Sequence, residues 1–240
     1  VVGFGPGGYE HMTAKCIDVI EKADIITGYT TYVEMLKEFF PDKTYLATPM
    51  MQEVKRCRMA VEEAMKDQTV AMVSSGDSGI YGMAGIIYQV AEEMGADIEI
   101  ETVPGVTAAS AAASVLGAPL MHDFAVISLS DLMTPLDLIM KRVDCAGQSD
   151  LIVCLYNPKS KKRTGYVEQA ADILMKYRSP GTPVGIVRHA GRRGEQSQIT
   201  TLAELKDAEI DMFSVVLIGN SQTYVSNGRM ITPRGYNLEK

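Results

Sequence analysis

The sequence predicts an α/β fold in two domains, with a mostly parallel sheet in the N-terminal domain and a mixed sheet in the C-terminal domain. Short apolar runs alternate with amphipathic stretches of helical length through most of the 240 residues, a pattern typical of βα units. The segment Leu116-Gly117-Ala118-Pro119 interrupts this alternation. Because glycine and proline break regular structure, we place a boundary there, between domains 1–117 and 118–240.

In the N-terminal domain, strand and helix candidates follow one another. Short apolar runs predict strands over 1–4, 24–28, 69–73 and 98–103. Apolar side chains at helical spacing predict helices over 13–22, 31–39, 51–66, 82–94 and 107–116. The last of these stretches consists almost entirely of Ala, Ser and Val. We therefore expect it to be buried against a sheet, with its small side chains permitting close approach.

The C-terminal domain starts the alternation again and then changes character. Strands are predicted over 125–129, 151–156 and 183–188, with helices over 135–145 and 164–177. Two further strands, 196–200 and 214–218, are separated only by a short helix over 202–206. Parallel strands need a longer crossover connection, so a hairpin or mixed sheet is expected in this region.

Composition excludes several functional classes. A net charge of −7 disfavours a general nucleic-acid binder, which usually carries a basic surface. No apolar run approaches the roughly 18 residues needed to cross a bilayer, and no secretory leader is visible, which predicts a cytoplasmic protein. The four cysteines form no Cys-x-x-Cys pair and are predicted to be buried free thiols. The three histidines are far apart in sequence, so no metal site is predicted.

Residues 74–85, Ser-Ser-Gly-Asp-Ser-Gly-Ile-Tyr-Gly-Met-Ala-Gly, are the most informative segment. They follow a predicted buried strand and precede a predicted helix, at the end of the strand where α/β proteins bind ligands. Asp77 could accept a hydrogen bond from a ligand hydroxyl or amine. Alternatively, Asp77 or Ser78 caps a tight turn into the helix. Both interpretations remain open from the sequence.

The glycine-rich segment after the first strand, Gly3-Phe4-Gly5-Pro6-Gly7-Gly8, resembles a dinucleotide-binding loop only superficially. Pro6 has no backbone N–H to donate to a pyrophosphate. The next strand ends in Thr27-Gly28-Tyr29, without the carboxylate that would bind a ribose. A nicotinamide cofactor is therefore disfavoured.

Four segments in order resemble the tetrapyrrole (corrin/porphyrin) methylase family over essentially the whole chain. They are Val2-Gly3-Phe4-Gly5-Pro6-Gly7, Ala23-Asp24-Ile25-Ile26, Ser75-Gly76-Asp77-Ser78-Gly79-Ile80-Tyr81 and Val103-Pro104-Gly105-Val106-Thr107-Ala108. Three more resemble the cobalamin-pathway branch that methylates precorrin-3B at C17. They are Leu155-Tyr156-Asn157-Pro158-Lys159-Ser160, Ile186-Val187-Arg188-His189-Ala190-Gly191 and Thr232-Pro233-Arg234-Gly235-Tyr236.

This resemblance implies that S-adenosylmethionine binds in the cleft between two α/β domains and leaves as S-adenosyl-L-homocysteine. It also implies a tetrapyrrole substrate and a homodimer, with neither nucleic-acid nor membrane partners. By motif match, the cofactor contacts in the first domain fall on Pro6, Ser75, Gly76, Asp77, Ile80, Tyr81, Thr107 and Ala108. Those in the second domain fall on Leu155, Tyr156, Ala190, Gly191 and Pro233.

One position departs from the family pattern. The aspartate proposed as a proton acceptor in uroporphyrinogen methylases aligns with Tyr29, so that carboxylate base cannot be carried over. The catalytic candidates are His189, Tyr29 and Thr30, and Ser128, Ser130 and Asp131 could also donate or accept protons. A polycarboxylate substrate needs local positive charge. The substrate-binding candidates are Gly5, Ser130, Lys159, Arg163 and Arg188, the lysine and first arginine lying in a basic cluster with Lys161 and Lys162.

The expected function is S-adenosylmethionine-dependent methylation of precorrin-3B or cobalt-precorrin-3 at C17, with ring contraction, in cobalamin biosynthesis. The alternatives are another precorrin methyltransferase, acting at C11 or C20, and a non-catalytic ligand-binding regulator on an α/β scaffold. Both cobalt-containing and metal-free substrates are compatible with these motifs.

Overall fold

The computed structural model describes residues 1–160 and 162–237. The chain forms two compact units, Val1–Ala108 and Ala109–Lys240, which are described separately below. Among the described residues, no helix combines the length and the apolar character that crossing a membrane would require.

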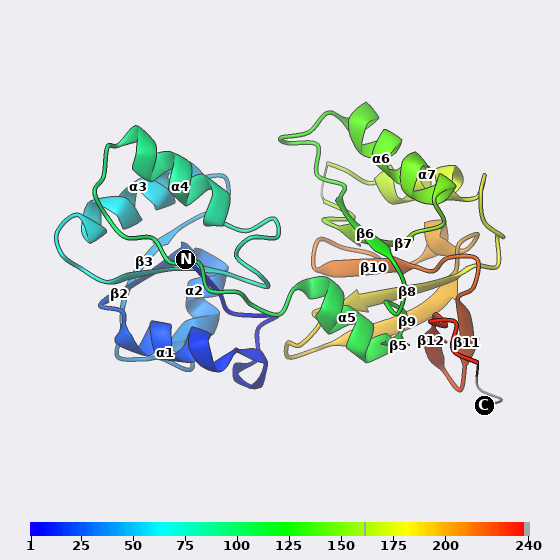
Figure 1. Ribbon diagram of the computed structural model, residues 1–240, viewed down its shortest axis with the longest axis horizontal. Coiled ribbons are helices and arrows are strands. Elements are labelled where there is room, and N and C mark those ends of the chain that lie inside the picture. Colours follow the sequence, from blue (N-terminus) through cyan, green and yellow to red (C-terminus); the bar gives the residue numbers. More distant parts are fainter. Residues whose placement is uncertain (161, 238–240) are drawn as a thin grey trace. The chain divides into compact units, whose positions relative to one another are not determined.

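Unit 1 contains a parallel four-stranded sheet with helices on both faces (Figure 1). The strands are β1 (Val2–Gly3), β2 (Ile25–Tyr29), β3 (Thr44–Thr48) and β4 (Val70–Ser74), in the order β1-β4-β2-β3. The helices are the 3-10 helix η1 (Tyr9–His11) and α1 (Ala14–Lys22), α2 (Thr30–Lys37), α3 (Glu53–Ala64) and α4 (Ala84–Glu93). Each strand therefore presents its carboxyl end at the same edge of the sheet.

The side chains of β4 explain why both faces are covered. Ala71 and Val73 pack with apolar residues of α1 and α2, whereas Met72 packs with residues of α3 and α4. Successive strand residues point to opposite faces, so an uninterrupted apolar run needs a helical layer on each side. The short apolar run in the sequence therefore predicted this central strand correctly.

Two sequence predictions for unit 1 were wrong. The run 98–103 is not a strand, and only Val103 forms an isolated bridge, with Val2. The neighbouring strand β1 is only two residues long. Too few of its residues therefore lie beside the run 98–103 to form a ladder with it. Conversely, β3 was missed because its residues are mostly half-buried or exposed and include polar side chains, which weakens the apolar signal.

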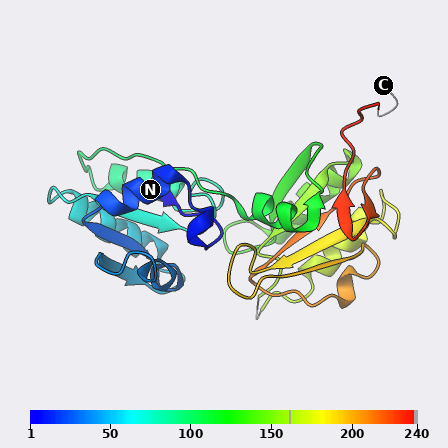
Figure 2. The same cartoon turned by 90° about the horizontal axis from the view of Figure 1, so that it is seen from below.

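Unit 2 contains a five-stranded mixed sheet, as predicted. Its strands are β6 (Phe124–Ser128), β7 (Ile152–Tyr156), β8 (Pro183–Arg188), β9 (Gln196–Thr201) and β10 (Ser214–Ile218), in the order β6-β7-β10-β8-β9. β6 and β7 are parallel, and β10 is antiparallel to both β7 and β8. Figure 2 shows the antiparallel strands β8 and β9 side by side. The carboxyl ends of β6, β7 and β8 therefore share one edge.

Helices cover both faces of this sheet. α6 (Leu136–Gln148) and α7 (Tyr166–Leu174) enclose the main apolar core on one face. On the other face, α5 (Ala108–Leu116) approaches so closely that a Cβ on Gly185 of β8 would lie 2.2 Å from Leu116 Cδ1. The prediction that this small-residue helix is buried against a sheet is confirmed.

A small sheet in unit 2 was not predicted. It consists of β11 (Tyr224–Ser226), β12 (Arg229–Ile231) and β5 (Gly117–Ala118), in that order. These strands are two or three residues long, too short to give a recognisable pattern. The remaining element, the 3-10 helix η2 (Leu205–Asp207), falls close to the predicted short helix.

The cysteines differ in exposure. Cys16, Cys57 and Cys154 are buried, whereas Cys145 is exposed, so the prediction that all four are buried was wrong for Cys145. Cys145 lies on α6 away from the residues of that helix that enter the core. Burial raises the pKa of the Cys16 and Cys57 thiols to about 11 and that of Cys154 to about 12.

We expect iodoacetamide to alkylate only Cys145 in the folded protein at pH 8, because the thiolate is the reactive form and the other three thiols are buried and protonated. Intact-mass measurement before and after denaturation would show one and then four adducts. Rapid native labelling of Cys154 would contradict this assignment.

Candidate functional site

Three glycine-containing motifs of unit 1 meet at the carboxyl edge of its sheet. β1 and β4 are neighbours, so the loops that follow them emerge side by side. Gly5 and Gly76 join these loops through reciprocal hydrogen bonds, Gly5 N to Gly76 O at 3.0 Å and Gly76 N to Gly5 O at 2.7 Å. Gly105 of the third motif packs against the same backbone, and a Cβ there would lie 2.2 Å from Gly76 O.

Asp77 holds this arrangement together. Its Oδ1 accepts hydrogen bonds from the backbone N–H groups of Gly79 and Ile80, at 2.8 and 3.1 Å, and its Oδ2 accepts one from Gly105 at 3.0 Å. The carboxylate thus stabilises the turn that follows β4. It does not cap α4, which has no side-chain cap on its N-terminal residue. Direct contact between Asp77 and a ligand stays a prediction.

The other predicted cofactor residues of unit 1 surround this turn. Ser75 and Thr107 are half-buried, and Pro6 is buried. A Cβ added to Gly76 would lie 3.8 Å from Ala108 N and 3.9 Å from Thr107 Cα, so this backbone lies next to Gly76. Ile80 and Tyr81 expose large apolar side chains, 40% and 59% accessible. The structure therefore brings together the residues that the motifs grouped in unit 1.

Tyr29 and Thr30 lie where β2 passes directly into α2, at the same edge of the sheet. The Tyr29 ring makes an edge contact with Tyr32, with centroids 5.2 Å apart, and the buried Arg56 guanidinium lies 6.0 Å from its centroid. Arg56 is itself held by Thr48 Oγ1 and by the carbonyl of Pro49. No pattern in the sequence indicated a buried Arg56, because a charged residue on a helix is usually exposed.

In unit 2, the predicted residues other than Pro233 lie at the shared carboxyl edge of β6, β7 and β8. The Tyr156 hydroxyl accepts a hydrogen bond of 2.6 Å from the backbone N–H of Ala109. It therefore satisfies one of the N–H groups that the first turn of α5 leaves unpaired. The Leu155 side chain is fully buried in the core, so only its backbone could contact a cofactor.

Arg188 and His189 follow one another at the end of β8. Arg188 Nε forms an ion pair of 2.7 Å with Asp211 Oδ2, so a carboxylate of the chain already balances its charge. His189 has a positive φ of 53° and stacks on Phe213, with centroids 5.0 Å apart. The next residues, Ala190 and Gly191, continue into a turn in which Gly191 N donates to Glu195 Oε2 at 2.7 Å.

A polar cluster occupies the ends of β6 and β7. Asn157 Nδ2 donates to Ser128 Oγ at 2.9 Å. Arg163 Nη1 donates to the carbonyl of Leu129, also at 2.9 Å, and Ser130 is half-buried beside it in sequence. Of the other residues in the basic segment, Lys159 is half-buried and Lys161 lies outside the described residues.

Pro233 follows β12, one residue after the buried Thr232. Thr232 N donates to the carbonyl of Ala118 in β5, and its hydroxyl is 2.8 Å from that of Thr223. These bonds attach the segment that carries Pro233 to unit 2.

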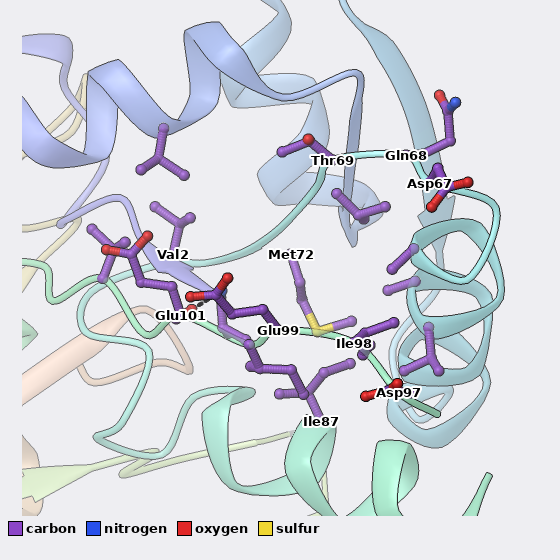
Figure 3. Close-up of a pocket in the computed structure, with 18 residues that line it drawn as sticks. Val2, Asp67, Gln68, Thr69, Met72, Ile87, Asp97, Ile98, Glu99 and Glu101 are labelled. Atoms are coloured by element: carbon purple, nitrogen blue, oxygen red, sulfur yellow. Dashed lines mark hydrogen bonds between the residues drawn. The ribbon is translucent and has the colours of Figure 1, made fainter. Parts of the chain in front are cut away.

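A cavity of about 530 Å³ lies elsewhere in unit 1, at the amino ends of β1 and β4 (Figure 3). Its wall includes Val2, Met72 and Ile87, and the carboxylates of Asp97, Glu99 and Glu101 surround it. Because α/β proteins bind ligands at the carboxyl ends of strands, and because acidic groups repel a polycarboxylate, this cavity is a poor candidate for the substrate site.

Comparison with known proteins decides the family. The family model for tetrapyrrole (corrin/porphyrin) methylases matches residues 1–206. The chain belongs to this family. Among the curated tetrapyrrole methylases it is 48% identical to a probable cobalt-factor III C(17)-methyltransferase from Salmonella typhimurium, over 99% of both chains. It is 47% identical to a cobalt-factor III methyltransferase from Priestia megaterium, with 98% of this chain matching 44% of that longer protein.

The crystal structure of the methyltransferase CobJ is similar to this tetrapyrrole methylase over 97% of the present chain and 98% of its own. The two share 33% sequence identity and superpose with a TM-score of 0.89. Family membership and this structural similarity confirm the predicted α/β fold and enzyme class.

Proposed function

We propose that this tetrapyrrole methylase transfers a methyl group from S-adenosylmethionine to C17 of cobalt-factor III or a closely related tetrapyrrole, with ring contraction, in cobalamin biosynthesis. The observation that carries the proposal is the similarity along the entire length to the Salmonella typhimurium protein of that name. The names of the relatives favour a cobalt-containing substrate, a choice that the motifs left open.

The residues of unit 1 fit this cofactor. Around Gly76 and Asp77, the exposed apolar side chains are those of Ile80 and Tyr81, and the predicted contact residues include no basic side chain. The N–H of Gly5 is used by Gly76 and Pro6 has none, so the loop is not built for a phosphate. A carboxylate beside an apolar surface suits a cationic, phosphate-free ligand, and S-adenosylmethionine supplies an activated methyl group on such a sulfonium.

We propose that both units contribute to the site through the loops at the carboxyl edges of their sheets. Pro6, the turn 75–81, Thr107 and Ala108 would hold the cofactor from unit 1. Tyr156, Ala190, Gly191, Pro233 and the backbone of Leu155 would contribute from unit 2. Orienting both reactants can lower the barrier by several kcal/mol, up to roughly 7–11 for ideal geometry.

The substrate contacts and the proton transfers are assigned to polar groups at the same edges. Arg163 and Lys159 would bind substrate carboxylates, with Gly5 and Ser130 beside the macrocycle, and Arg188 would do so only in competition with Asp211. His189, whose ring is fixed by stacking on Phe213, is the favoured acid or base. Tyr29 and Thr30 are the candidates of unit 1.

We also propose a cytoplasmic homodimer. The β11–β12 hairpin supports the dimer, because Tyr224 and Val225 each leave nearly half of their surface exposed. This pair of exposed apolar residues on a short hairpin would contact the second copy.

The test is incubation of the purified protein with methyl-labelled S-adenosylmethionine and the trimethylated tetrapyrrole, with and without cobalt, followed by mass and absorbance analysis. Labelled, ring-contracted product methylated at C17 is expected with cobalt-factor III. Methylation at C11 or C20 would replace the proposal with another enzyme of the pathway. Tight binding of S-adenosyl-L-homocysteine without turnover on any of these substrates would favour the non-catalytic regulator.

A further inference from the structure

The polar cluster in unit 2 contains two residues that the proposed function has not used. β6 and β7 are parallel neighbours, with Ser128 paired to Tyr156 at their carboxyl ends. The loop after β6 carries Asp131, and the loop after β7 carries Arg163 and leads into Tyr166, the first residue of α7. Side chains from two loops and one helix start thus gather at one place.

Arg163 is held in a fixed orientation there. Its Nη1 donates to the carbonyl of Leu129 at 2.9 Å, and its Nε donates to Ser160 Oγ at 3.2 Å. Its Nε also lies 3.8 Å from Asp131 Oδ1, and only 14% of the side chain is exposed. None of these contacts uses Nη2. The three contacts fix the plane of the guanidinium and leave the N–H groups of Nη2 for another acceptor.

Asp131 is itself fixed from the opposite side. The Tyr166 hydroxyl donates to Asp131 Oδ2 at 2.8 Å. This hydrogen bond raises the pKa of Tyr166 further above its ordinary value, which already lies well above neutral pH, so the phenol donates at neutral pH. Asp131 Oδ1 therefore faces Arg163, while Oδ2 accepts a hydrogen bond from the first residue of α7.

Building on the proposed function, we propose that Asp131 and Tyr166 are positioning residues that hold Arg163 ready to bind a carboxylate of the tetrapyrrole substrate. A planar guanidinium binds carboxylates through paired hydrogen bonds. An arginine already fixed in orientation loses less conformational entropy on binding than a free one. Asp131 then acts through Arg163 and is not the missing carboxylate base.

Unit 2 contains a matched control for this arrangement. Tyr177 OH donates to Asp144 Oδ1 at 2.9 Å, and Lys176 Nζ lies 3.7 Å from the same oxygen. Tyr166 begins α7, whereas this second tyrosine–aspartate–cation group joins α6 to the segment after α7. The second group therefore lies at the opposite end of α7 from the carboxyl edge. The same chemical change can be made at both places.

The experiment compares Tyr166→Phe and Asp131→Asn with Tyr177→Phe and the wild type. Dissociation constants for uroporphyrin, a polycarboxylate tetrapyrrole, are measured by absorbance titration. Those for S-adenosyl-L-homocysteine are measured by calorimetry, with melting temperatures as a folding check. We expect Tyr166→Phe and Asp131→Asn to weaken uroporphyrin binding roughly three- to tenfold. This is less than the roughly tenfold or greater loss expected when a hydrogen bond to a charged ligand group is removed directly, because both residues act through Arg163. Binding of S-adenosyl-L-homocysteine should stay at the wild-type level.

In turnover with cobalt-factor III, the same two variants should raise KM by a similar factor and leave kcat nearly unchanged. The inference is overturned if Tyr166→Phe binds uroporphyrin as Tyr177→Phe does, if both ligands are weakened equally, or if the wild type fails to bind uroporphyrin. Failure of the wild type to methylate cobalt-factor III would instead count against the proposed function, and the uroporphyrin comparison would still decide the role of Asp131 and Tyr166.

Discussion

Gly105→Ala is expected to abolish S-adenosylmethionine binding and to destabilise unit 1. The added Cβ would lie 2.2 Å from Gly76 O and 2.5 Å from Gly3 O. Both neighbours are backbone atoms, and they belong to the strand ends and the turn on which the candidate site is built. The motif must therefore move away from them, at a cost of about 3 kcal/mol or more in the free energy of unfolding.

Calorimetry with S-adenosyl-L-homocysteine and urea denaturation would measure the two effects of Gly105→Ala. Gly85→Ala is the matched control, because Gly85 lies in α4 and its added Cβ would have no atom within 4 Å apart from its chain neighbours and the backbone of its own helix. It should bind normally and gain up to about 1 kcal/mol in stability, since alanine is the better helix former. Wild-type affinity in a folded Gly105→Ala variant would refute the assignment of this motif to the cofactor site.

Asp77→Ala is expected to lower both the stability of the apo protein and the affinity for the cofactor. The carboxylate accepts hydrogen bonds from the backbone N–H groups of Gly79, Ile80 and Gly105. Removal of the carboxylate leaves these three N–H groups without their acceptor and detaches the turn after β4 from the segment that contains Gly105. Since a hydrogen bond to a charged group contributes about 1.5–3 kcal/mol, we expect a loss of about 3 kcal/mol or more in the free energy of unfolding.

Asp24→Ala is the control for removing a carboxylate that binds backbone. Asp24 Oδ2 accepts one hydrogen bond, from Thr69 N at 2.8 Å, at the amino end of the strands. This variant should lose about 1.5 kcal/mol, the lower end of the same range for a single exposed hydrogen bond, and bind S-adenosyl-L-homocysteine normally. An Asp77→Ala variant with wild-type stability and weakened binding would show that Asp77 acts on the ligand alone.

The two interpretations of Asp77 could not be separated from the sequence. A carboxylate two residues before a glycine can close a local turn, and that part of its role is readable from spacing. Its third partner, Gly105, is 28 residues away, and nothing in local composition indicates that bond. The structure therefore shows that Asp77 holds the turn to a distant segment, a role that its position after a strand could not distinguish from a ligand contact.

The arginines show the same difference between what the local sequence indicates and what contacts with distant residues decide. The sequence identified Arg163 and Arg188 as candidate carboxylate binders because both lie in locally basic segments and a guanidinium binds carboxylates. Only their three-dimensional surroundings distinguish them. Asp211 pairs directly with Arg188 at 2.7 Å, whereas Asp131 lies 3.8 Å from Arg163. The buried Arg56 gave no signal at all, since the carbonyl and hydroxyl groups that hold it come from another segment.

The sequence by itself determined the α/β fold, most of the strands and helices, the mixed sheet of unit 2 and the family. These depend on apolar periodicity and on ordered glycine motifs, which are local properties of the chain. The tertiary structure alone decided that the run 98–103 is not a strand, that Gly5, Gly76 and Gly105 share one backbone contact, and that Tyr166 and Asp131 support Arg163. Each of these depends on which distant backbone and side-chain groups the strand order brings together, and hydrogen bonds over such separations leave no periodic trace in the sequence.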